Sequence, residues 1–282
     1  MPDKSPLVST DWLAAHLNAP DVRVVDASWY LPQDGRDPKT EYRAAHIPGT
    51  VFFDVDEICD TTSPYPHMLP SPEKFASRAR KLGLGDGNRI VVYDGGGVKS
   101  AARVWWMFKH FGHRDVVVLD GGFQKWRAEG RPVEDLPPMP RDRHFTARIN
   151  AGTVRSLDEM RRCVANGEAQ IVDARSPGRF SGQEPEPRPG LKGGHIPGAF
   201  NVPNGKLFDP ETGCLLPADK LRALFTGAGV DLSRPIVTSC GSGITAANLY
   251  LALTVLGVRD VALYDGSWAE WGAQEDTPVA TA

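Results

Sequence analysis

The 282-residue chain has no strong excess of either charge and contains few cysteines. It carries 32 Lys and Arg against 35 Asp and Glu, which gives a formal net charge of −3. Proteins that bind nucleic acid or anionic membranes through a basic surface usually show a clear basic excess, so the composition predicts neither partner. The four cysteines form no Cys-x-x-Cys pair and no zinc spacing. This pattern predicts a cytoplasmic protein without a metal site.

We expect neither a signal peptide nor a membrane span in this sequence. Residues 1–18 have neither the basic start nor the apolar core of a secretory signal. The longest uncharged run, 235–258, is long enough to cross a membrane. However, glycine, serine, threonine and asparagine interrupt its first half. This run is therefore predicted to be a buried strand, a turn and a half-buried helix.

The sequence consists of two related halves. Four segments recur in the same order in both: 24–27 with 171–174, 46–49 with 195–198, 90–97 with 236–243, and 119–122 with 264–267. A repeat this long indicates a duplicated domain and not a solenoid. We predict an N-terminal domain at 1–135, a linker at 136–152 and a C-terminal domain at 153–282. The first domain has Asp94 where the second has Cys240, so only the second offers a nucleophile.

Each half alternates short apolar runs with helical stretches. The predicted strands are 22–25, 90–93, 116–119, 171–173, 236–239 and 261–264. The predicted helices are 72–82, 101–111, 157–165, 217–228 and 246–256. This alternation predicts an α/β fold with two tandem domains, each a mainly parallel sheet flanked by helices. The proline-rich stretch 131–152 is expected to run extended over the surface.

One candidate nucleophile stands out, because Cys240 lies between an apolar strand and a helix. The loop that follows contains Gly241, Ser242, Gly243, Ile244 and Thr245. A glycine-rich turn before a helix forms a nest of backbone N–H groups that stabilises an anion and therefore favours the reactive thiolate. A tyrosine-phosphatase loop would need an arginine at position 246, where this chain has alanine. A cysteine protease would need a histidine base, and none lies nearby in the sequence.

Several further motifs carry a family resemblance. They are the segments 26–32, 52–56, 63–70, 178–180, 184–188 and 265–268, together with the Cys240 loop. In combination they resemble the two-domain, tandem rhodanese family along nearly the whole chain. The neutral loop is similar to that of family members that use 3-mercaptopyruvate, whereas thiosulfate-specific members have basic residues after the cysteine. Ile244 stands where family members usually have valine.

The resemblance implies a reaction and a set of site residues. Cys240 would take sulfur from 3-mercaptopyruvate and release pyruvate. The resulting persulfide would pass its outer sulfur to cyanide or to a thiol, such as a thioredoxin-like protein or a low-molecular-weight thiol, without a metal or organic cofactor. The resemblance places Arg179 and Arg188 on the donor's carboxylate and carbonyl. It also implies a relay of Ser242, His67 and Asp56.

Other interpretations remain open at this point. From composition alone, the two arginines also fit a solvated surface loop, His67 fits a solvated histidine, and Asp56 fits a helix cap or an ion pair. Two alternative functions fit the same motifs. One is a thiosulfate:cyanide sulfurtransferase, and the other is a non-catalytic tandem rhodanese module that binds partners.

Overall fold

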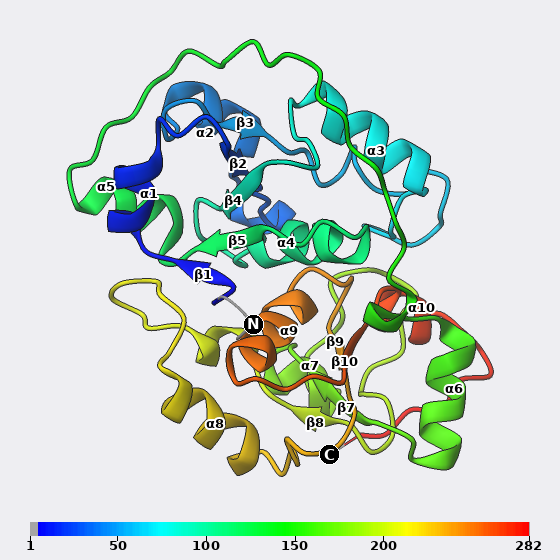
Figure 1. Cartoon of the computed structure of the whole chain (residues 1–282). Helices are drawn as coiled ribbons and strands as arrows, with labels where there is room; N and C mark the ends of the chain where they lie inside the picture. The colour runs from blue at the N-terminus through cyan, green and yellow to red at the C-terminus, as the bar shows by residue number, and fades with distance from the viewer. Residues whose placement is uncertain (1–4, 282) are drawn as a thin grey trace. The chain divides into compact units, whose positions relative to one another are not determined.

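The computed structural model describes residues 5–281, which form two compact units (Figure 1). Unit 1 runs to Cys59, resumes over Pro70–Asn150 and includes Asp209–Leu215. Unit 2 comprises Asp60–Leu69, Ala151–Phe208 and the described residues from Leu216 onward. Each unit is therefore built mainly from one half of the sequence and contains one short segment from the other half. The domain boundaries at 135 and 152 remain a prediction.

Unit 1 contains a five-stranded parallel sheet in the order β1-β5-β4-β2-β3. Its strands are β1 (Leu7–Val8), β2 (Val22–Asp26), β3 (Val51–Phe52), β4 (Arg89–Tyr93) and β5 (Val116–Leu119). Its helices are α1 (Thr10–His16), η1 (Pro32–Asp34), α2 (Pro38–Ala44), α3 (Pro72–Lys81), α4 (Ala101–His110) and α5 (Gly122–Ala128).

Unit 2 repeats this arrangement, with strand order β6-β10-β9-β7-β8 and parallel pairing throughout. Its strands are β6 (Val154–Arg155), β7 (Gln170–Asp173), β8 (Phe200–Asn201), β9 (Ile236–Ser239) and β10 (Val261–Tyr264). Its helices are η2 (Ala151–Thr153), α6 (Leu157–Asn166), α7 (Pro177–Ser181), η3 (Asn204–Leu207), α8 (Ala218–Gly227), α9 (Ala246–Val255) and α10 (Ser267–Trp271). The predicted fold of two parallel sheets flanked by helices is confirmed.

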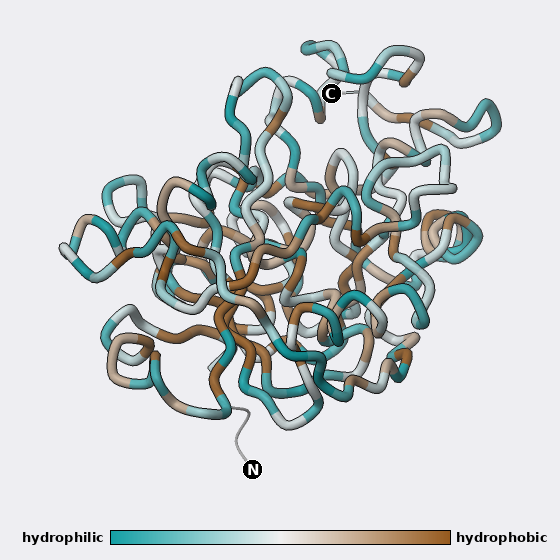
Figure 2. Tube along the Cα trace, turned by 90° about the horizontal axis from the view of Figure 1, so that it is seen from above, coloured by the Kyte–Doolittle hydropathy of each residue, from teal (hydrophilic) through white to brown (hydrophobic). Residues whose placement is uncertain are grey.

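Helices cover both faces of each sheet, which explains why the strands are continuously apolar. In unit 1, alternate residues of β2, β4 and β5 pack against Leu13 of α1 and Trp126 of α5. Ile90 and Val92 point to the opposite face and are also fully buried, and α4 contacts β4 and β5. Figure 2 shows the same division, with brown hydrophobic stretches running through the interior and teal segments in the outer turns.

The uncharged run at 235–258 forms β9, the Cys240 loop and α9, as predicted. The expectation of a half-buried helix is wrong, however, because seven of the ten α9 residues are buried. A helix covered on most sides can be apolar around its whole circumference. In residues 5–281 no helix has the length and apolar character needed to cross a membrane.

The predicted extended linker contains no helix or strand between residues 131 and 150, apart from an isolated bridge of Glu134 with His46. Figure 1 shows it as a long green trace. Met139 is 96% exposed, whereas Phe145 is fully buried against Phe75 and Phe108. Phe145 thus packs a largely exposed segment against the core of unit 1, and backbone hydrogen bonds such as that from Arg148 N–H to the Phe111 carbonyl (2.9 Å) also hold it.

Candidate active site

Cys240 lies at the carboxyl end of β9, the central strand of the unit 2 sheet. Parallel α/β sheets place their ligand sites at this edge. The cysteine is 2% exposed. Its backbone N–H donates to the Ser267 hydroxyl (3.1 Å), and its carbonyl accepts the Trp268 N–H (2.9 Å). The first residues of α10 therefore hold the backbone of Cys240 in place.

The loop after Cys240 has free backbone donors. Gly243 adopts a left-handed conformation (φ 79°), and α9 begins at Ala246. Within the described chain, the N–H groups of Ser242, Ile244 and Thr245 donate to no protein acceptor. Unpaired N–H groups before a helix of this length favour an anion in the loop.

The matching loop of unit 1 shows where such an anion sits. Asp94 follows the central strand β4, as Cys240 follows β9. Its carboxylate accepts the N–H groups of Gly96 and Ala101, both at 2.9 Å. In unit 2 the side chain at this position is the thiol of Cys240. The N–H of Ser242 corresponds to that of Gly96, whereas the N–H of Ala247, which corresponds to that of Ala101, donates to the Ile244 carbonyl (3.3 Å).

Two guanidinium groups lie beside the Cys240 loop. Arg179, on α7, is so close to Gly241 that a Cβ added there would lie 3.0 Å from Nη2. Burial lowers the pKa of Arg188, and the nearby positive charge of Arg179 acts in the same direction, whereas the sulfur of Cys240 opposes it. Arg188 is therefore within range of electrostatic interaction with both Arg179 and Cys240. Both arginines are half-buried, which does not fit a solvated loop.

An acidic side chain between two arginines orients Arg179. Glu186 accepts from Nη2 and Nε of Arg179 (2.6 and 3.2 Å) and from Nη1 of Arg175 (2.7 Å). Arg175 is itself paired with Asp173 at the end of β7. Planar guanidinium–carboxylate pairs of this kind fix both position and orientation.

His67 is brought to the loop from a distant part of the sequence. Its Nδ1 atom lies 2.9 Å from the Ser242 hydroxyl, and the histidine is only 6% exposed. The solvated-loop interpretation of His67 therefore does not hold. The backbone of His67 is left-handed (φ 62°), which costs a residue with a Cβ about 1–2 kcal/mol.

Asp56, the third residue of the predicted relay, belongs to unit 1. Both of its carboxylate oxygens accept the indole N–H of Trp29, at 3.1 and 3.0 Å. This contact accounts for the orientation of the carboxylate inside unit 1. The role of Asp56 in a relay remains a prediction.

Comparison with known proteins agrees with the duplicated fold. Residues 9–129 and 156–274 each match the rhodanese-like domain. The chain belongs to the rhodanese family. A 3-mercaptopyruvate sulfurtransferase of Escherichia coli K12 is 44% identical over 96% of this chain and 96% of its own length. A thiosulfate sulfurtransferase of Rattus norvegicus is also 44% identical, over 94% of this chain and 91% of its own.

A solved structure extends the comparison to three dimensions. The crystal structure of an Escherichia coli 3-mercaptopyruvate sulfotransferase has a TM-score of 0.87 and 41% sequence identity, and the match covers 94% of this chain and 99% of the other. The family resemblance inferred from the motifs is confirmed. This rhodanese is a sulfurtransferase with a small-molecule sulfur donor.

Sequence reasoning missed Ser267, which supports the backbone of Cys240. Ser267 is fully buried and left-handed (φ 49°), and its hydroxyl donates to the carbonyl of Tyr264 at 2.8 Å. The matching residue of the first rhodanese domain is Gly122 (φ 58°). A serine at a position that suits glycine was a visible signal in the repeat comparison. Glu186 was missed as well, because only its contacts reveal its role.

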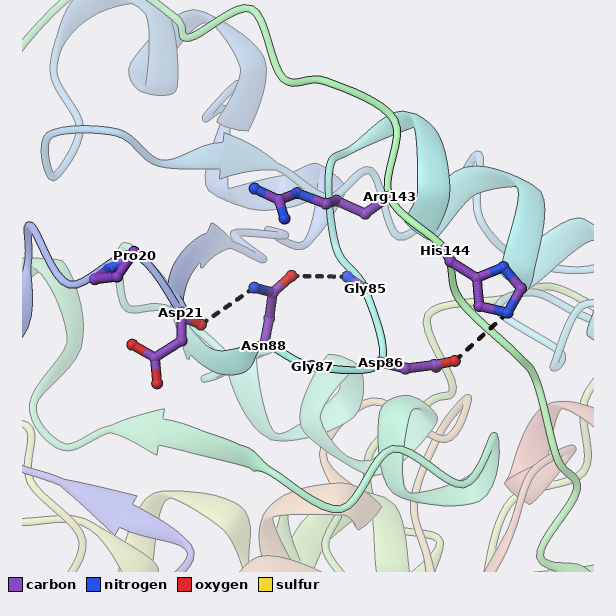
Figure 3. A pocket seen from close by; sticks show the side chains of 8 residues that line it. All are labelled: Pro20, Asp21, Gly85, Asp86, Gly87, Asn88, Arg143 and His144. Atoms are coloured by element: carbon purple, nitrogen blue, oxygen red, sulfur yellow. Dashed lines mark hydrogen bonds and ion pairs between the residues drawn. The ribbon is translucent and has the colours of Figure 1, made fainter.

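The rhodanese chain also has a cavity of about 350 Å³ that contains none of the candidate site residues (Figure 3). It is lined by Pro20, Asp21, Gly85, Asp86, Gly87, Asn88, Arg143 and His144. Asp21 and Asn88 immediately precede β2 and β4, so the cavity lies at the amino ends of these strands. Asn88 is used internally, because it accepts from Gly85 N–H and donates to the Asp21 carbonyl. This cavity therefore plays no part in the chemistry below.

Proposed function

We propose that this protein transfers sulfur from 3-mercaptopyruvate to a thiol or cyanide acceptor through a persulfide on Cys240, and releases pyruvate. The observation that carries the proposal is the placement of Arg179 and Arg188 beside a cysteine loop whose own side chains are neutral. The donor has one carboxylate, remote from its sulfur. Guanidinium groups bind such a carboxylate in a planar, bidentate manner.

In the first step, the Cys240 thiolate attacks the sulfur of the donor. The donor's carbon–sulfur bond breaks, and its electron pair moves onto carbon to form the enolate of pyruvate. We propose that the Ser242 hydroxyl and His67, which lie 2.9 Å apart, polarise the donor carbonyl and supply the proton that the enolate needs. The loop N–H groups stabilise both the attacking thiolate and the persulfide anion.

In the second step, an acceptor thiolate or cyanide attacks the outer sulfur of the persulfide. The sulfur–sulfur bond breaks, and its electrons return to Cys240 as thiolate. We propose a thioredoxin-like protein or a low-molecular-weight thiol as the acceptor. The cytoplasmic location inferred from the cysteine pattern is part of this proposal, although one relative, from Arabidopsis thaliana, is named a mitochondrial enzyme.

Thiosulfate is the second candidate donor. The overall identity does not separate the two donors, because relatives named for each are equally similar to this chain. Thiosulfate is a dianion without a carbonyl, so a site for it needs positive charge next to the nucleophile. Gly241 and Ser242 provide none, which favours 3-mercaptopyruvate.

The test measures persulfide formation and donor choice together. After exposure to 3-mercaptopyruvate, mass spectrometry should find one extra sulfur atom on Cys240 and an equivalent amount of pyruvate. Cys240→Ser should form neither and still fold, because a hydroxyl is a poor nucleophile at neutral pH. Variants of Cys59, Cys163 or Cys214 should keep the activity. Sulfur transfer by Cys240→Ser, or no adduct on the unmodified protein with either donor, would overturn the proposal.

A further inference from the structure

Two short segments are exchanged between the halves of the chain. Residues 60–69, here the His67 loop, come from the first half and lie in unit 2, whereas residues 209–215, here the Gly213 loop, come from the second half and lie in unit 1. Each loop is closed in the same way. Asp60 N–H donates to the Met68 carbonyl, and Asp209 N–H donates to the Cys214 carbonyl, both at 2.8 Å. The two loops are therefore counterparts in the duplicated fold.

Each exchanged loop is held by an equivalent aspartate. Asp265, directly after β10, accepts the Leu69 N–H at 2.7 Å. Asp120, directly after β5, accepts the Leu215 N–H at 2.8 Å. Asp265 is buried, and a buried carboxylate that accepts an N–H makes a stronger bond than a neutral acceptor does. The anchoring hydrogen bond from a leucine N–H to an aspartate is thus present in both units.

The loops differ in length and sequence, and one of the differences lies two residues before the anchored leucine. The Gly213 loop has glycine there (φ 67°), and the His67 loop has histidine in nearly the same left-handed conformation (φ 62°). Glycine adopts this backbone freely, whereas histidine adopts it only when the surrounding contacts impose it. The imidazole reaches Ser242 from this strained backbone. The hydrogen bond between the aspartate and the leucine therefore lies next to a strained histidine in unit 2, but next to an unstrained glycine in unit 1.

We propose that Asp265 is a positioning residue, which keeps His67 in its left-handed conformation and hence within hydrogen-bond reach of Ser242. Its bond to Leu69 lies two residues from the strained histidine, so its loss lets the backbone relax and moves the imidazole away. Tyr65 gives the loop a second attachment, since its hydroxyl accepts from Gln274 (2.7 Å). The loop can therefore stay on unit 2 while the histidine loses its alignment. The expected effect on kcat rests on the proposed function, whereas the effect on the position of His67 does not.

The kinetic test compares Asp265→Ala with its structural counterpart, Asp120→Ala. Misplacing a catalytic group by about 1 Å can cost up to roughly a hundred-fold in rate. We expect kcat for 3-mercaptopyruvate to fall about ten-fold in Asp265→Ala at nearly unchanged KM, and to stay as in the unmodified protein in Asp120→Ala. Asp265→Asn keeps an oxygen acceptor, so its kcat should fall only about two- to three-fold.

A double variant tests whether Asp265 acts through His67. His67→Ala alone should lower kcat by about a hundred-fold, the lower end of general acid–base catalysis. Adding Asp265→Ala to it should lower kcat no further, because the group being positioned is already gone. A further ten-fold loss in the double variant, or an equal loss in Asp120→Ala, would overturn the positioning role.

An NMR measurement is independent of activity. The imidazole ¹⁵N signals of His67, assigned by their loss in His67→Ala, should shift in Asp265→Ala and stay in place in Asp120→Ala. If Asp265→Ala does not fold, the same comparison uses Asp265→Asn, with a smaller shift expected. If the unmodified protein transfers no sulfur, the proposed function fails and this comparison still decides the inference. Unchanged His67 signals in a folded Asp265 variant would refute it.

Discussion

The Asp94 carboxylate accepts the backbone N–H of Ala101 at 2.9 Å, in the loop of the first rhodanese domain that corresponds to the Cys240 loop. Its other oxygen accepts the Gly96 N–H. This loop carries its own anion, so we expect Asp94 to contribute to stability and not to chemistry. Asp94→Ala should lower the free energy of unfolding by about 2–3 kcal/mol, because hydrogen bonds to a buried charged group are lost. Chemical denaturation measures this difference.

The matched control truncates the residue at the same position of the second domain. Cys240→Ala removes a single sulfur atom, which is a much weaker hydrogen-bond acceptor than a carboxylate. Its cost should be about 1 kcal/mol, the value for a small buried apolar group. Equal losses in the two variants would show that the Asp94 carboxylate adds nothing beyond packing.

The arginines next to the Cys240 loop should determine how well 3-mercaptopyruvate binds. Arg179→Ala and Arg188→Ala should each lower kcat/KM by roughly ten- to a hundred-fold, since each removes a charge-assisted hydrogen bond to the donor. Glu186→Gln should have a smaller effect, mainly on KM, because it weakens the pair that orients Arg179. Steady-state kinetics with purified variants measures all three.

Arg161 provides a control for the loss of a positive charge. Its side chain is partly exposed and forms ion pairs with Asp158 and Asp276. Neither partner belongs to the Cys240 loop. Arg161→Ala should leave kcat/KM unchanged. If Arg179→Ala and Arg188→Ala also leave it unchanged, the donor binds elsewhere.

Asp26 should make stability depend on pH. It is 4% exposed at the end of β2, and burial raises its pKa from 3.8 to about 6, with the nearby Asp94 charge adding to the rise and hydrogen bonds from Ser28 and Tyr93 opposing it. The native state therefore holds a proton that the unfolded state releases between about pH 4 and 6. The free energy of unfolding should fall as pH rises through this window, by an amount on the order of 1–3 kcal/mol.

Asp26→Asn isolates this contribution, because an amide does not titrate. Its unfolding free energy should fall less steeply between pH 4 and 6 than that of the unmodified protein, as followed by urea titrations at several pH values. Parallel curves for the two proteins would show that Asp26 does not titrate in this range.

The sequence predicted the long elements well and the short ones poorly. The central strand β9 (Ile236–Ser239) was predicted to the residue, because its first three residues are all β-branched. The edge strands β1, β3, β6 and β8 have two residues each and show no periodicity. Each forms because the backbone N–H and C=O groups along the edge of a longer neighbouring strand are available for pairing. The helix α7, which carries Arg179, has five residues, so only Ser176 before it and Gly182 after it indicated a helix.

The same limit applies to the candidate site. The loop from Cys240 to Thr245 could be inferred locally, since strand, glycine-rich turn and helix are contiguous in the sequence. The contact of His67 with Ser242 joins residues 175 positions apart, and no local pattern predicts it. Glu186 and Ser267 act only through contacts. The family motifs pointed to His67. Glu186 and Ser267 also lie within motif segments, at 184–188 and 265–268, but the motifs gave neither residue a role.

Donor choice should depend on charge in the Cys240 loop. We expect the unmodified protein to prefer 3-mercaptopyruvate over thiosulfate by at least about ten-fold in kcat/KM, which corresponds to about 1.4 kcal/mol in transition-state binding. Replacing Gly241 by Arg and Ser242 by Lys should raise kcat/KM for thiosulfate, because two cations then attract the dianion. The same double change should lower kcat/KM for 3-mercaptopyruvate, since His67 loses the Ser242 hydroxyl.

A rise for thiosulfate must be separated from damage to the existing site. A side chain at position 241 meets Arg179, because even a Cβ there would lie 3.0 Å from Nη2. Gly241→Ala is the matched control: it displaces Arg179 in the same way but adds no charge. It should therefore lower kcat/KM for 3-mercaptopyruvate and leave the value for thiosulfate no higher than in the unmodified protein. If Gly241→Ala raises kcat/KM for thiosulfate as much as the double change does, donor choice depends on the position of Arg179 and not on loop charge. If the double change leaves thiosulfate use unaltered, or the unmodified protein already prefers thiosulfate, loop charge does not set it.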